Sequence, residues 1–98
     1  MLIPTRNVLK RTLMLSLAAT RGGPLRLKIL MVLVKNPKNT NQIASEFFID
    51  YKTAQHHIRV LEKSGLVVSS KNKYDNTYAP STLLKENIDA LKELGKTR

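Results

Sequence analysis

Five polar or basic side chains recur along segment 51–64 at offsets of 0, +3, +4, +7 and +11, which places them on one face of a helix. The apolar residues Ala54, Ile58 and Leu61 would form the opposite face. Glutamine can pair with adenine and arginine can fork onto guanine, so such a polar face can read base edges in a DNA major groove. The alternative is an amphipathic helix whose polar side meets only solvent. The five residues are Lys52, Gln55, His56, Arg59 and Lys63.

The first turn of this predicted helix adds two residues of suitable chemistry. Tyr51 and Thr53 flank Lys52, and hydroxyl and ammonium groups can bond to phosphate oxygens. Free backbone amides in a first helical turn also attract phosphate. Because the N-terminal residues of a recognition helix contact base edges, we expect these three residues to lie at the DNA.

A shorter helix and a tight turn precede this segment. We expect the short helix over residues 40–47, with Thr40 or Asn41 as its N-cap. Phe48 and Ile49 are expected to form the turn that follows, and Asp50 is placed to cap the helix over 51–64. The order of short helix, turn and polar helix predicts a helix-turn-helix, which places its second helix in the major groove.

A basic hairpin follows the polar helix. Gly65 suits the position directly after the end of a helix. Strands are expected at residues 66–68 and 77–79. The hairpin tip carries Lys71 and Lys73, which can contact the phosphates of a DNA strand. The alternative for the tip is an ordinary solvated turn.

Leucine-rich helices complete the pattern at 7–20, 24–35 and 82–94, the last of them capped by Ser81 or Thr82. Pro24 suits the first turn of its helix. The buried stripe predicted for the helix over 24–35 comprises Leu27, Leu30, Met31 and Val34.

Length and charge agree with this pattern. The 98 residues suit one domain over 1–98, mainly α with a small β-hairpin wing: a winged helix-turn-helix in the order α-α-α-α-β-β-α. The net charge of +10 favours a polyanionic partner, and nucleic acid is the first candidate. The chain has no cysteine and no run of the ~20 apolar residues that span a membrane, so we expect a cytoplasmic protein without a membrane partner.

Several segments taken in order resemble the ArsR-like winged-helix regulators, and are most similar to their archaeal members. The resemblance covers about residues 20–80. It rests on Asn41-Gln42-Ile43-Ala44, Asp50-Tyr51-Lys52-Thr53, His56-His57-Ile58 and Leu61-Glu62-Lys63-Ser64-Gly65-Leu66-Val67, and on the Arg21-Gly22-Gly23-Pro24 entry to the helix over 24–35.

The resemblance implies a homodimer built from the terminal helices 7–20 and 82–94, although their leucines could serve the core alone. It also suggests metal sensing, and here the sequence departs from the family pattern. Thiolate ligands are impossible without cysteine, and no histidine joins the acidic residues of the last helix. The adjacent His56 and His57 point about 100° apart on a helix, so we expect no shared metal ion and no cofactor. We expect His57 to be a packed or capping side chain.

We therefore predict a sequence-specific double-stranded DNA-binding transcriptional regulator, a homodimer that uses a helix-turn-helix (about 40–64) and a basic wing (about 66–79). Arg21, Arg26 and Lys38 are expected to add phosphate contacts. The alternatives are a sequence-tolerant architectural or nucleoid protein and a protein-interaction module. No catalytic grouping is present in the sequence, so an enzyme is not expected.

Overall fold

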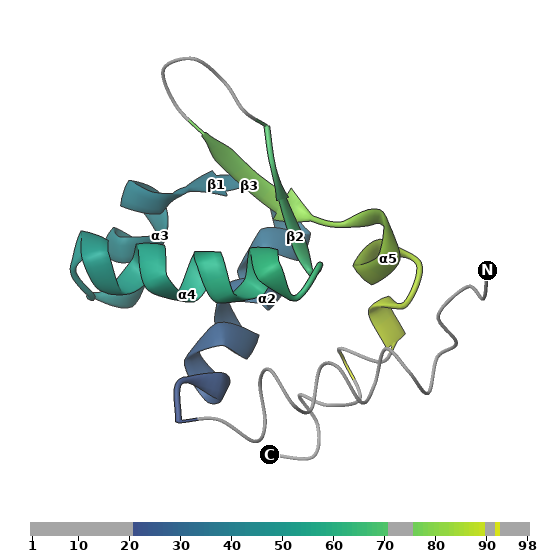
Figure 1. Ribbon diagram of the computed structural model, residues 1–98, viewed down its shortest axis with the longest axis horizontal. Helices are drawn as coiled ribbons and strands as arrows, with labels where there is room; N and C mark the ends of the chain where they lie inside the picture. Colours follow the sequence, from purple (N-terminus) through teal and green to yellow (C-terminus); the bar gives the residue numbers. More distant parts are fainter. Residues whose placement is uncertain (1–20, 71–75, 90–91, 93–98) are drawn as a thin grey trace.

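The computed structural model describes residues 21–70, 76–89 and 92 (Figure 1). Its first element is helix α2 (Gly23–Lys35), which carries Pro24 in the first turn as predicted. Proline is suited to that turn because it lacks an N–H, which a helix start leaves without an intrahelical acceptor. The predicted helix over 7–20 lies outside the described residues.

The buried face of α2 differs from the predicted stripe. Met31 is exposed, so its place in the stripe was wrong, whereas Val34 is partly buried and packs against the core. Helix α4 (Tyr51–Lys63) and strand β3 (Thr77–Pro80) both contact α2 and enclose it from more than one side. The buried apolar side chains of α2 are therefore Leu27, Ile29, Leu30 and Leu33.

Helix α3 (Thr40–Phe47) packs against α4 and begins with a reciprocal cap. The Gln42 N–H donates to Asn39 Oδ1 at 2.7 Å, and the Asn39 N–H donates to Gln42 Oε1 at 2.8 Å. These two bonds satisfy amide groups that the helix start leaves free. The N-cap is therefore Asn39, and the prediction of Thr40 or Asn41 was wrong; Thr40 is the first helical residue and is buried.

Helix α4 begins as the sequence predicts. Asp50 is its N-cap, and the Thr53 N–H donates to Asp50 Oδ1 at 2.7 Å. Hydrogen bonds from the Thr53 side chain and backbone lower the pKa of Asp50.

The end of α4 explains the glycine that follows it. Gly65 has a φ of +77°, a left-handed conformation that glycine adopts without steric cost. Its N–H donates to the carbonyl oxygen of Glu62 at 3.0 Å, and the Leu66 N–H donates to that of Leu61 at 3.0 Å. These bonds form a Schellman motif, which ends the helix and turns the chain into strand β2 (Val67–Ser69).

A small antiparallel sheet joins the two ends of the helix-turn-helix. Its strand order is β1-β3-β2, and the two-residue strand β1 (Lys38–Asn39) was not predicted. Lys38 pairs with Tyr78 of β3, and Ser69 of β2 pairs with the same tyrosine from the other side. In Figure 1 strands β2 and β3 lie side by side, and β3 contacts α2.

The chain after the sheet is less regular than predicted. Helix α5 (Thr82–Lys85) is capped by Ser81, whose hydroxyl accepts the Leu84 N–H at 3.2 Å. A turn at residues 86–87 interrupts the expected helix over 82–94, and helical structure resumes at residues 88–89. The Asn87 side chain donates to the Leu83 carbonyl at 2.9 Å in this turn. Much of the remainder of the predicted helix lies outside the described residues.

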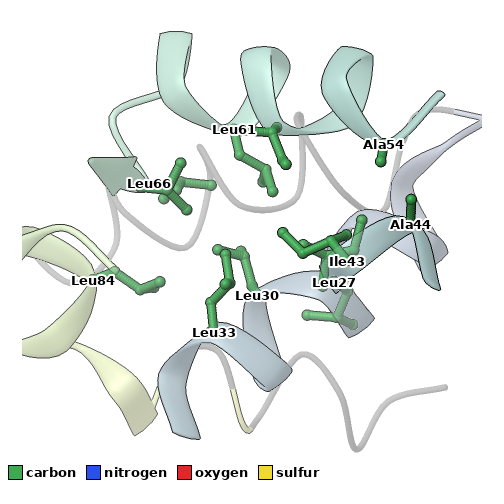
Figure 2. Close-up of a cluster of buried hydrophobic side chains, with 12 residues drawn as sticks. Leu27, Leu30, Leu33, Ile43, Ala44, Ala54, Leu61, Leu66 and Leu84 are labelled. Atoms are coloured by element: carbon green, nitrogen blue, oxygen red, sulfur yellow. The ribbon is translucent and has the colours of Figure 1, made fainter. Parts of the chain in front are cut away.

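One apolar cluster holds these elements together (Figure 2). Leu61 and Ala54 point from α4 toward the side chains of α2 and α3. Leu66 and Leu84 close the cluster on the side of the sheet and α5. Among the described helices, none is long and apolar enough to cross a membrane.

Candidate nucleic-acid interface

Helix α4 separates its side chains as predicted. Ala54, Ile58 and Leu61 are buried, which confirms the predicted inner face. The opposite face is open to solvent, although Gln55 is only partly exposed because it lies nearer the edge of the core. The exposed residues among the predicted DNA contacts are Tyr51, Lys52, Thr53, His56, Arg59 and Lys63.

The shape and charge of this face suit a DNA groove. Thirteen residues make a helix about 20 Å long, and the major groove is about 12 Å wide. The helix carries three cations, Lys52, Arg59 and Lys63, against one acid, Glu62. Its outer side therefore combines a positive charge with the amide and guanidinium groups that pair with bases.

The hairpin is described in its strands but not at its tip. Lys71 and Lys73 lie outside the described residues, so their predicted role stays a prediction. Tyr78 of β3 interacts through its hydroxyl with the Thr40 side chain, and burial raises the pKa of Tyr78. The hairpin is thus held beside the start of α3.

A buried pair fixes the orientation of α4 against α2. Arg26 Nη1 lies 2.9 Å from His57 Nδ1, and the two residues are only 5% and 8% exposed. Because a guanidinium can only donate, His57 accepts through Nδ1 and carries its proton on Nε2. Burial, and then the Arg26 and His56 charges, lower the pKa of His57. The expectation of a packed His57 is confirmed.

The same pair corrects the role predicted for Arg26. A side chain that is buried against α4 cannot contact a DNA phosphate, so that prediction was wrong. Gly22 permits the arrangement, since a Cβ there would lie 2.7 Å from His57 Cε1 and 2.8 Å from Arg26 Nη1. Lys38 is partly buried and pairs with Glu46 at 3.5 Å, whereas Arg21 is exposed.

One prominent residue was missed from the sequence. Phe48 was expected only to help form the turn, yet its side chain is 95% exposed and its φ is +54°. Phenylalanine is rarely found in this left-handed conformation. The sequence signal for this residue was a large aromatic side chain at the turn of a predicted helix-turn-helix, where glycine or asparagine would be expected.

Comparisons with known proteins agree with this geometry. The protein-family model described as the N-terminal domain of the methanogenesis regulatory protein FilR1 matches residues 11–82. An uncharacterized HTH-type transcriptional regulator from Methanocaldococcus jannaschii is 40% identical over 48 residues, which are 49% of this chain and 50% of that protein. The match thus spans half the length of this relative.

Solved structures show the same fold. HlyU from Vibrio cholerae has a TM-score of 0.67 at 27% identity, covering 91% of this chain and 92% of its own. A homodimeric winged helix-turn-helix DNA-binding domain from Mycobacterium bovis has a TM-score of 0.69 at 20% identity, covering 99% and 89%. An ArsR-like transcriptional regulator from Rhodococcus has a TM-score of 0.64 at 19% identity, covering 90% and 80%. The predicted winged helix-turn-helix fold and the resemblance to ArsR-like regulators are confirmed.

Proposed function

Because this chain belongs to the family of the methanogenesis regulatory protein FilR1 N-terminal domain and is a winged helix-turn-helix transcriptional regulator, we propose that it binds double-stranded DNA sequence-specifically in the cytoplasm. The observation that carries the proposal is the division of α4. Its inner face is buried in the core, and its outer face presents base-pairing and phosphate-binding side chains to solvent.

In the proposed complex, α4 lies in the major groove, where some of its side chains contact bases and others contact the phosphate backbone. Gln55 and Arg59 have the paired groups that distinguish adenine and guanine, and the other contacts position the helix on phosphates or neighbouring bases. The buried Arg26–His57 bond keeps α4 at a fixed angle while the outer side chains bind. The proposed DNA-binding residues are Tyr51, Lys52, Thr53, Gln55, His56, Arg59 and Lys63 of α4, with Lys71 and Lys73 of the wing.

We further propose a homodimer, with the terminal segments 7–20 and 82–94 as its contact elements. The M. bovis domain of similar fold is homodimeric, which supports the same assembly here. A two-fold dimer would place its two α4 helices in successive major grooves. Half-sites should then lie about 34 Å apart on one side of the duplex.

Selection of bound sites from random duplex DNA tests the proposal most directly. A sequence-specific dimer should enrich a pseudo-palindrome and bind it at least ~10³-fold more tightly than unrelated duplexes at the same salt concentration. Enrichment of no motif, with equal affinity for all duplexes, would support a sequence-tolerant architectural protein instead.

A charge-matched pair of variants tests the face itself. The double variant Lys52→Ala/Arg59→Ala should lose the selected site and show a weaker dependence of affinity on salt, since phosphate contacts govern that slope. The control Lys28→Ala/Lys35→Ala removes the same charge from exposed positions on α2 and should retain specificity. Equal losses in both variants would reject α4 as the reading element.

A further inference from the structure

Phe48 combines two features that do not stabilise a folded chain. Its side chain is 95% exposed, so it gains almost nothing from the apolar core. Its backbone is left-handed with φ +54°, where glycine or asparagine fits with less steric conflict. Neither packing nor backbone geometry therefore accounts for phenylalanine at this position.

The neighbouring residues hold Phe48 in place and direct its ring outward. Its N–H is bonded to the carbonyl oxygens of Ala44 and Ser45 at the end of α3. The next residue, Ile49, packs partly against the core, and its N–H donates to the Ala44 carbonyl at 3.0 Å. The turn is thus fixed on both sides, and the ring projects from a rigid base.

The position of the turn points to one occupant. Phe48 lies two residues before the N-cap of α4, and the exposed first turn of α4 follows with Tyr51, Lys52 and Thr53. The N-terminal part of a recognition helix is where base edges are contacted. The cation at Lys52 favours a polyanion over a second apolar surface at this place.

We propose that Phe48 is a DNA-binding residue whose ring contacts an apolar group of the duplex, either a thymine methyl in the major groove or the face of a neighbouring deoxyribose. A phenyl ring offers no hydrogen bond, and contact with the thymine methyl is the apolar means of base recognition in the major groove. The inference rests on the proposed DNA-binding function and adds a contact from outside α4.

Substitution by glycine separates a DNA contact from a structural role. Phe48→Gly relieves the left-handed conformation, so its Tm should be no lower than that of the wild-type chain, while affinity for the selected site falls several-fold. Phe48→Asn is the polar control that also tolerates this conformation, and Phe48→Leu retains an apolar side chain. Leucine should retain more of the affinity than asparagine or glycine.

Deoxyuridine substitution identifies the group that is contacted. Each thymine of the selected site is replaced in turn by deoxyuridine, which removes only the methyl group. Loss of a methyl contact should weaken binding of the wild-type chain about four-fold per half-site at one position, and leave Phe48→Gly binding unchanged there. Lower affinity of the glycine variant with no coupled thymine would assign the contact to the deoxyribose.

Two results would overturn the inference. One is that Phe48→Gly and Phe48→Asn bind the selected site with wild-type affinity while Lys52→Ala/Arg59→Ala does not, which would leave the proposed function intact. The other is that leucine, asparagine and glycine variants lose affinity equally, or change the oligomeric state, since neither is expected of an apolar DNA contact. If the wild-type chain selects no DNA site, the proposed function fails first and independently.

Discussion

Replacing His57 by leucine removes the acceptor of the buried Arg26 hydrogen bond and keeps an apolar side chain of similar bulk in its place. The bond joins the start of α2 to the middle of α4 over a distance of 2.9 Å. We expect His57→Leu to destabilise the fold because the guanidinium loses a partner in a site from which water is largely excluded.

The size of the loss follows from the type of bond. A hydrogen bond to a charged group contributes about 1.5–3 kcal/mol, so we expect the free energy of unfolding to fall by about 2 kcal/mol. For a domain of this length, that corresponds to a decrease in Tm of about 8–16 °C. The exposed neighbour His56 is the matched control, and His56→Leu should change stability by less than about 0.5 kcal/mol.

Urea unfolding of Arg26→Met, His57→Leu and the double variant Arg26→Met/His57→Leu completes a double-mutant cycle for this bond. Because both partners of the bond are then absent, the double variant should be more stable than the sum of the single losses predicts, by about 1 kcal/mol or more. Additive losses, or a His57→Leu chain as stable as the His56→Leu chain, would refute the assignment of this bond as the link between α2 and α4.

Three further predictions concern the Arg26–His57 pair and the N-cap of α5. Because folding lowers the pKa of His57, the unfolded chain binds more protons than the folded chain just below pH 6.5. The free energy of unfolding should therefore fall as pH decreases from about 6.5 toward the folded pKa. His57→Leu should flatten this part of a curve of unfolding free energy against pH. Gly22→Ala places a Cβ 2.7 Å from His57 and 2.8 Å from Arg26, so urea unfolding should show a loss of about 1–3 kcal/mol that largely disappears in Arg26→Met/His57→Leu. Ser81→Ala removes the cap on the Leu84 N–H, and thermal unfolding should show a loss of about 1 kcal/mol; an unchanged Tm would mean that the cap contributes nothing.

Local patterns in the sequence predicted the parts of the fold that local interactions determine. The apolar and polar faces of α4 could be predicted because a 3.6-residue period is read without knowledge of the partner elements. Asp50 and Gly65 marked its ends correctly, since capping depends on residues within one turn. The open and buried sides of the candidate interface followed from the same period.

The errors occurred where a distant residue decides the outcome. Strand β1 has two residues and exists because Tyr78, far along the chain, pairs with Lys38. Arginine is usually exposed, and burial of Arg26 depends on His57, which lies 31 residues away. The aromatic residue at the turn was a signal, but a turn pattern alone does not show whether an apolar side chain such as that of Phe48 is exposed or packed on the core.

Strand β3 has a further consequence for how the protein can evolve or be redesigned. The chain enters the helix-turn-helix directly from β1 and leaves it into β2 after only Ser64, Gly65 and Leu66, and both strands pair with β3. Strand β3 therefore holds both ends of the α3–α4 pair, because it pairs with the strand before α3 and with the strand after α4. If α4 binds DNA as proposed, its outer residues could be exchanged to suit a new DNA site while this strand pairing keeps the orientation of the helix unchanged.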